Sequence, residues 1–245
     1  MSAIVFDIET GALPWEEVEK FYEPPAGLAP WNDDMVRYGV TKDVTKKKEK
    51  YDQVRADYET KLARQAADNE AHRLEWLSRG ALSPLTGRVL AVGLRSERGT
   101  AILGGDGEEE WKVLTDFWLS YMSARAASRR MVGFNIFGFD LPFLIRRSWF
   151  HGVAVPESLL EKGRYWSPVF CDLMQVWGCG VYGERVSLDT AARYFGVGGK
   201  PDNVTGADFG RLWAGPPEDR EKALAYLAND LDMTWQIAER LGVAP

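Results

Sequence analysis

The sequence has few cysteines. Among its 245 residues only Cys171 and Cys179 carry a thiol, and their number and spacing suit neither a zinc site nor a disulfide framework. We interpret them as reduced structural thiols in a reducing compartment. A small secreted domain held together by disulfides is therefore excluded.

Long apolar runs and a basic leader are also missing. No apolar stretch reaches the roughly 18 residues that a membrane span requires, and the N-terminus runs directly into a strand. We therefore expect a soluble, cytoplasmic (intracellular) protein without a membrane partner.

Basic residues are not in excess, since the formal net charge is −6. This charge argues against a protein that coats nucleic acids generally. It does not argue against a nuclease, because acids at a metal site add negative charge that bound cations offset locally. Hydrophobic residues make up 45% of the chain, which is enough for a substantial core.

What the sequence does contain, near its start, is a strand over residues 3–9 with two acids. Alternate side chains of a strand point to opposite faces, so Asp7 and Glu9 share one face. The other face is apolar and is expected to point into a core: it carries Ile4, Phe6 and Ile8. Because neighbouring carboxylates resist burial unless a cation joins them, this pair indicates a site for Mg²⁺ or Mn²⁺.

The remaining hydrophobic patterns predict an α/β fold. Further strands are expected at 88–95, 99–103 and 130–134, and residues 170–174 suit a short strand or a helix start. Helices are expected at 112–127, 140–150 and 187–195, and a last one follows Pro216-Pro217 and buries Leu224, Leu227, Leu231 and Trp235. This order indicates a mixed sheet with helices on its faces.

A second polar motif surrounds the strand at 130–134. Asn135 ends this strand, and Asp140 follows after a short loop and opens a helix. Either residue has an ordinary alternative role, Asp140 as a helix cap and Asn135 as a turn residue. Two further acids lie near element starts; Asp189 suits a helix cap, and the role of Asp172 stays open.

The third motif lies on the last helix. Tyr226 and Asp230 are four residues apart and therefore share a helix face, beside the apolar stripe. The alternative is an ordinary Tyr–Asp pair on a partly exposed face.

Together these residues resemble a known family. Phe6-Asp7-Ile8-Glu9-Thr10, then Asn135-x4-Asp140, then Tyr226-x3-Asp230 are similar, in order, to the three motifs of the DEDD (DnaQ-like) 3′–5′ exonucleases. The tyrosine marks the DEDDy branch, because the sister branch has histidine five residues before the final Asp, where this chain has Ala225. The segment 200–206 with Leu212-Trp213 resembles stand-alone predicted exonucleases related to the proofreading domain of family B DNA polymerases.

The resemblance implies a fold and a site. The fold is ribonuclease H-like, a five-stranded mixed sheet flanked by helices. Two divalent ions, Mg²⁺ or Mn²⁺, are implied at Asp7, Glu9, Asp140 and Asp230, with Tyr226 orienting the attacking water. The same resemblance implies substrate contacts from Thr10, Gly11, Asn135 and Phe139.

The implied activity is removal of nucleoside monophosphates from DNA 3′ ends by two-metal-ion hydrolysis. Two alternatives stay open: an exoribonuclease with the same site, and a non-catalytic nucleic-acid-binding or polymerase-accessory subunit. We expect a single-stranded or frayed 3′ end, of DNA, as the partner. A replication or repair partner is a further hypothesis, and the oligomeric state stays open.

One part of the chain departs from the family pattern. Residues 11–40 suggest an irregular segment, and residues 45–78 predict one long amphipathic helix or two, with Tyr51, Val54, Tyr58 and Leu62 at helical spacing. We interpret residues 1–245 as a single exonuclease domain with a helical insertion (arm) at 40–80, because the acid motifs fall at both ends of the chain. The arm is either solvated or a clamp that docks a partner.

Overall fold

A five-stranded mixed sheet organises most of the chain. The computed structural model describes residues 3–105, 108–156, 168–179, 181, 183–199 and 205–244. The strands are β1 (Ala3–Ala12), β2 (Gly87–Ser96), β3 (Gly99–Leu103), β4 (Arg130–Gly133) and β5 (Phe170–Asp172). They lie in the order β3-β2-β1-β4-β5, with β4 parallel to its neighbours and β2 antiparallel to both of its own. The predicted mixed sheet is confirmed.

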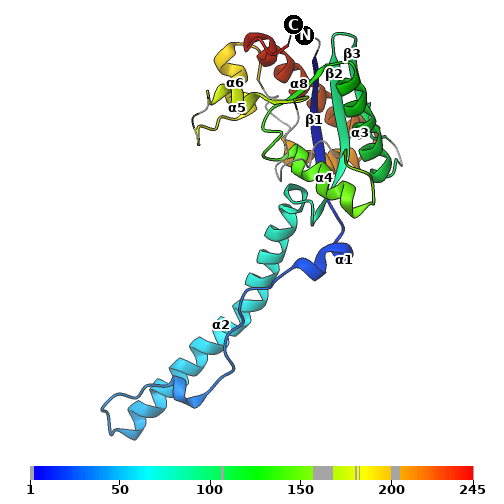
Figure 1. Cartoon of the computed structure of the whole chain (residues 1–245). Helices are drawn as coiled ribbons and strands as arrows, with labels where there is room; N and C mark the ends of the chain where they lie inside the picture. The colour runs from blue at the N-terminus through cyan, green and yellow to red at the C-terminus, as the bar shows by residue number, and fades with distance from the viewer. Residues whose placement is uncertain are drawn as a thin grey trace. The chain divides into compact units, whose positions relative to one another are not determined.

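Helices pack on both faces of this sheet (Figure 1). One face is covered by α3 (Glu110–Ala126) and α4 (Asp140–Phe150), over a core that includes Phe6 and Ile8. The other face is covered by α7 (Gly206–Trp213) and α8 (Pro217–Arg240), and α6 (Leu188–Phe195) packs on α8. The short α5 (Leu173–Trp177) follows β5 directly.

The capping residues and the apolar stripe predicted for the helices are present in the structure. Ser187 caps α6 by accepting the Thr190 N–H at 3.1 Å, and Gly196 ends that helix in the left-handed conformation, φ 65°. In α8 the predicted apolar stripe is buried at Leu227, Leu231 and Trp235, whereas Leu224 is half-buried. The sequence analysis did not predict α7.

Strand β1 alternates as predicted. Phe6 and Ile8 belong to the core under α3 and α4, while Val5 belongs to the core under α8. Asp7 and Glu9 therefore project toward the α8 side. The β1–β2 register shifts by one residue between Glu9 and Thr10, so a β-bulge lies at the acids. Bulges of this kind commonly redirect side chains beside functional sites.

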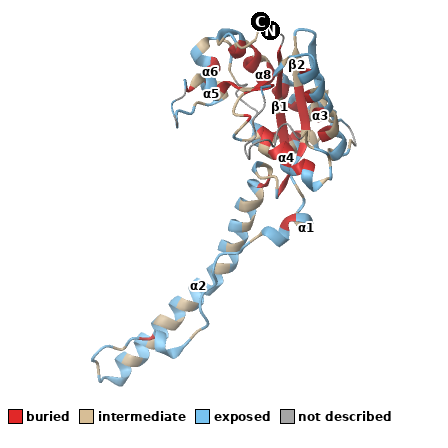
Figure 2. Ribbon diagram, viewed as in Figure 1, coloured by how far each residue is buried: buried red, intermediate tan, exposed pale blue. Residues whose placement is uncertain are grey.

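The segment Pro14–Arg79 forms a second compact unit. Its main element is α2 (Val44–Ser78), one unbroken helix of 35 residues with no buried residue, drawn in tan and pale blue in Figure 2. The segment before it contains the helix α1 (Trp15–Val18) and the 3-10 turns η1 (Glu19–Phe21) and η2 (Asp33–Met35). The single long helix resolves the choice between one helix and two.

Aromatic side chains attach this preceding segment to α2. The Trp31 ring centroid lies 5.3 Å from that of Tyr58, and the Tyr22 centroid lies 5.4 Å from that of Trp76. These contacts half-bury one stripe of α2, including the predicted Tyr51, Val54 and Tyr58; Leu62 is exposed. The stripe is thus covered by the chain's own residues.

The chain on either side of the segment Pro14–Arg79 belongs to the larger of the two compact units. Within that unit, the two stretches that flank the segment lie close together. The Leu13 N–H donates to the Thr86 carbonyl at 2.8 Å. A Cβ on Gly80, at the start of η3 (Gly80–Leu82), would lie 3.0 Å from Ala12 Cβ. The chain therefore leaves and re-enters the sheet at neighbouring points. One domain over 1–245 with an arm at 40–80 stays a prediction.

None of the helices formed by the described residues combines the length with the apolarity needed to cross a bilayer.

Candidate functional site

Three carboxylates from the two ends of the chain meet on the α8 side of the sheet. One oxygen from each of Asp7, Glu9 and Asp230 lies within 4.8 Å of the other two. Glu9 and Asp230 are buried and Asp7 is half-buried. Like charges at this separation favour a cation between them, and a set of oxygen donors alone suits Mg²⁺ or Mn²⁺. The donor set therefore fits the implied metals.

Gly93 allows α8 to come this close. It lies opposite Asp7 in the β1–β2 register. A Cβ on Gly93 would lie 2.5 Å from Leu231 Cδ1 and 3.0 Å from Leu227 Cδ1, and both leucines are fully buried. Because Asp230 directly precedes Leu231, the same close packing places Asp230 beside the acids of β1. Sequence analysis missed this residue; its signal is a glycine inside an apolar strand.

Asp140, the fourth predicted ligand, begins α4 and is 3% exposed. Its Oδ1 accepts the Ile8 N–H at 3.2 Å. This amide is available because β4 pairs with β1 only as far as Val5. Ile8 lies between Asp7 and Glu9, so Asp140 is held at the same stretch of β1, although it is not among the three acids within 4.8 Å.

The environment of Asp140 disfavours its charged form. Burial raises the pKa of Asp140 to about 7, backbone N–H groups at Asp140 and Ile8 lower it, and the nearby Asp172 carboxylate raises it. A divalent cation beside this carboxylate would favour the ionised form. The perturbed pKa thus suits a group that binds metal rather than one that is solvated.

Tyr226 lies one helical turn before Asp230 and is 3% exposed. The shared face of these two residues is confirmed, and it is buried rather than partly exposed. A Cβ on Gly206, the first residue of α7, would lie 3.6 Å from Tyr226 Oη. The phenol group therefore points toward the start of α7.

Thr10 and Gly11 were predicted to contact substrate. The Thr10 hydroxyl donates to the Ala81 carbonyl at 2.7 Å. A Cβ on Gly11 would lie 2.7 Å from Leu90 Cδ1, so the missing side chain serves close packing. Contact between the backbone of these residues and a 3′ end stays a prediction.

Asn135 and Phe139 lie on the loop between β4 and α4. Asn135 has the left-handed conformation, φ 62°, which is uncommon outside glycine. It borders a hollow of about 490 Å³ that Phe137 and Arg185 also line. Phe139 is partly buried, and its ring centroid lies 5.5 Å from that of Phe143.

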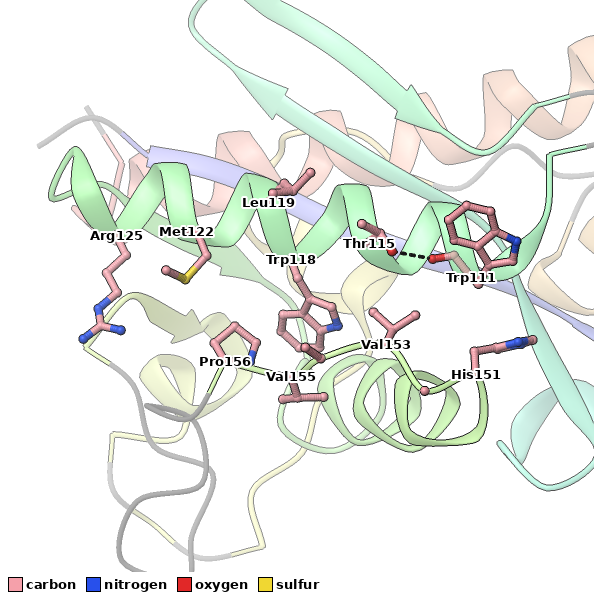
Figure 3. Close-up of a pocket in the computed structure, with 12 residues that line it drawn as sticks. Trp111, Thr115, Trp118, Leu119, Met122, Arg125, His151, Val153, Val155 and Pro156 are labelled. Atoms are coloured by element: carbon pink, nitrogen blue, oxygen red, sulfur yellow. Dashed lines mark hydrogen bonds between the residues drawn. The ribbon is translucent and has the colours of Figure 1, made fainter.

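A larger hollow, of about 810 Å³, lies elsewhere (Figure 3). Trp111, Trp118 and Met122 of α3 line one side of it, and residues 151–156 line the other. It lies on the α3 side of the sheet, opposite to the three acids, and none of the predicted site residues lines it. Volume alone therefore does not identify the candidate site.

Comparison with known proteins identifies the family. Residues 89–241, more than half of the chain, match a family described as predicted 3′–5′ exonucleases related to the exonuclease domain of PolB. The chain belongs to this family. The matched range contains the predicted residues of the second and third motifs, and it begins after β1. The structure supplies the proximity of Asp7 and Glu9 to Asp230.

A solved structure has a similar fold. It is the family B DNA polymerase from the hyperthermophilic archaeon Pyrobaculum calidifontis, with a TM-score of 0.51 and 24% sequence identity. The match covers 67% of this chain and 23% of the polymerase chain. The predicted ribonuclease H-like fold is confirmed, as is the relation to PolB exonucleases. The comparison with curated proteins gives no match. Of the quoted segment 200–206, residues 200–204 lie outside the described residues.

Proposed function

We propose that the protein is a metal-dependent 3′–5′ exonuclease that removes nucleoside monophosphates from DNA 3′ ends by two-metal-ion hydrolysis. The observation that carries the proposal is the meeting of Asp7, Glu9 and Asp230, from opposite ends of the chain, within 4.8 Å. Exonucleases of this kind depend on divalent metal ions. DNA is the proposed substrate because the similar solved structure is a DNA polymerase.

Each predicted residue has a role in this proposal. Asp7, Glu9, Asp140 and Asp230 would hold two ions, Mg²⁺ or Mn²⁺. When bound, such ions lower the pKa of water and stabilise the leaving oxygen of a phosphodiester. Tyr226 would position the attacking water through its hydroxyl, which can both donate and accept a hydrogen bond.

The substrate would be a single-stranded or frayed 3′ end. Asn135 and Phe139 would contact its last nucleotides from the β4–α4 loop, and the backbone at Thr10 and Gly11 would contact them from β1. The hollow of about 490 Å³ beside Asn135 would give the terminal nucleotides room. A replication or repair partner stays a hypothesis that binding assays with candidate proteins would test.

A time course on end-labelled substrates tests the proposal. DNA and RNA of one sequence, labelled at the 5′ end, are incubated with Mg²⁺, Mn²⁺ or EDTA. We expect a ladder that shortens from the 3′ end of DNA and stops in EDTA. Faster digestion of RNA would instead identify an exoribonuclease, because the 2′-hydroxyl is what distinguishes the two substrates.

Matched variants separate catalysis from binding. Asp7→Asn is expected to reduce the rate at least about 100-fold, whereas Asp116→Asn, which neutralises an acid paired with Lys112 on the surface of α3, should leave it unchanged. Tyr226→Phe should lose less activity than Asp7→Asn, because the carboxylates remain. Binding of nucleic acid without digestion under every metal condition would favour the accessory-subunit alternative.

A further inference from the structure

Asp172 makes hydrogen bonds to residues that are far from it in the sequence. It is the last residue of β5 and is 4% exposed. Its Oδ1 accepts the Asn135 N–H at 2.8 Å and the Met174 N–H at 3.0 Å, and its Oδ2 accepts the Phe137 N–H at 3.0 Å. Both carboxylate oxygens are therefore engaged by backbone donors.

Helix capping explains only one of these bonds. The Met174 bond is the N-cap interaction of α5, a helix of 5 residues. The other two reach residues 37 and 35 positions earlier in the chain, on the loop after β4. A carboxylate suits this arrangement because it accepts hydrogen bonds at both oxygens and donates none when ionised. An ordinary cap would need no such second connection.

The loop that Asp172 holds has a strained start. A non-glycine residue such as Asn135 keeps the left-handed backbone conformation when contacts with neighbouring residues hold it there. The Asn135 carbonyl in turn accepts the Gly138 N–H at 2.9 Å and the Phe139 N–H at 3.1 Å. A Cβ on Gly138 would lie 2.3 Å from Asn135 Oδ1, so the Asn135 side chain lies against the loop backbone.

The same loop ends at a proposed metal ligand. The Ile136 carbonyl accepts the Leu141 N–H at 2.9 Å, which places the first turn of α4. Asp140, in that turn, then accepts the Ile8 N–H of β1. The loop is thus fixed on one side by Asp172 of β5 and on the other by β1.

We propose that Asp172 is a positioning residue of the exonuclease site, whose carboxylate holds loop 134–139 so that Asn135 stays at the edge of the hollow proposed for substrate and Asp140 faces β1. This inference rests on the proposed function for what the loop presents. The hydrogen bonds of the Asp172 carboxylate do not depend on it, and they can be tested in the absence of any substrate.

The first test is amide hydrogen exchange in Asp172→Asn. Asparagine is isosteric but places an NH₂ group where one oxygen accepts, so it cannot keep both loop bonds. We expect the amide whose bond is lost, that of Asn135 or Phe137, to exchange at least about 10-fold faster, with β2 amides unchanged, because the loop opens locally. Asp116→Asn is the matched control, and a melting curve verifies folding. Unchanged exchange at both loop amides overturns the proposal.

The second test asks whether loosening the loop reaches the site. A Mn²⁺ titration by calorimetry should show about 10-fold weaker binding in Asp172→Asn, the scale expected when a group that orients a metal ligand is lost. This measurement needs no nuclease activity, so failure of the proposed function leaves it interpretable. Faster exchange with unchanged Mn²⁺ affinity and unchanged kcat/KM would make Asp172 a structural residue only.

A double-mutant cycle supplies the third readout. If Asp172 acts through Asn135, the rise in KM caused by Asp172→Asn should largely vanish in an Asn135→Ala background. The combined loss in kcat/KM should then be smaller than the product of the single losses. A combined loss equal to that product would contradict positioning through Asn135.

Discussion

Gly93→Ala adds one methyl group at the contact between β2 and α8. The new Cβ would lie 2.5 Å from Leu231 Cδ1 and 3.0 Å from Leu227 Cδ1. Carbon atoms in contact are ordinarily about 3.5–4.0 Å apart, so Leu231 or the helix must move by roughly 1 Å. Both leucines are 0% exposed, so neither side chain has space to turn away.

The expected cost follows from this overlap. Overpacking in a filled core costs about 1–3 kcal/mol. Alanine offsets part of it, about 0.4–1 kcal/mol, because it reduces the freedom of the unfolded chain. We therefore expect a net loss of roughly 1–2 kcal/mol, which for a chain of this size lowers Tm by about 2–8 °C. Urea unfolding and a thermal melt, both in EDTA, measure these quantities.

The metal site should weaken as well. Metal–ligand distances tolerate changes of only about 0.2 Å, whereas the helix that carries Asp230 is displaced by a larger amount. We expect Mn²⁺ affinity, measured by calorimetry, to fall at least about 10-fold. Gly105→Ala is the control, because a Cβ there meets nothing within 4 Å. Adding Leu231→Val to Gly93→Ala should restore affinity, since valine lacks the overlapping Cδ1 atom.

The reasoning is refuted by two outcomes. A Gly93→Ala protein with wild-type Tm and wild-type Mn²⁺ affinity would show that α8 does not depend on this glycine. A loss that Leu231→Val does not relieve would show that the clash is not at the position the structure indicates.

Three further predictions concern a titrating acid, a buried ion pair and the inserted unit. Burial raises the pKa of Asp140 to about 7 from an ordinary value near 4, so between these pH values the folded metal-free protein holds a proton that the unfolded chain releases, and its stability falls as pH rises. Asp140→Asn, which has no charge to bury, should therefore melt higher than wild type at pH 8 in EDTA but not at pH 4. Arg147→Met removes the guanidinium from the Glu110 carboxylate, which keeps only His151 and the Val89 N–H as partners, and should cost at most about 3–5 kcal/mol in urea unfolding, whereas Arg79→Met in an exposed pair should cost under about 1. Replacing residues 14–79 by a short Gly-Ser linker should preserve the circular dichroism of the sheet unit and its Mn²⁺ affinity, because Ala12 and Gly80 adjoin; an unfolded product would contradict this.

Local patterns were sufficient for the strands and for most helices of the sheet unit, although not for α7, and for the residue types of the candidate site. The alternation of β1 determined that Asp7 and Glu9 share a face, and the four-residue spacing determined the same for Tyr226 and Asp230. The Ser187 cap and the Gly196 terminus of α6 could likewise be predicted from the sequence, because capping depends on residues that are neighbours in sequence.

Contacts between distant segments were decided by the tertiary structure alone. The approach of α8 to Gly93, the reach of Asp172 to a loop 37 residues earlier and the bond from Ile8 to Asp140 all join residues far apart in sequence. Periodicity assigns a side chain to a face but does not specify which element covers that face. Whether separate acids form one site therefore depends on long-range packing, which only the tertiary structure decides.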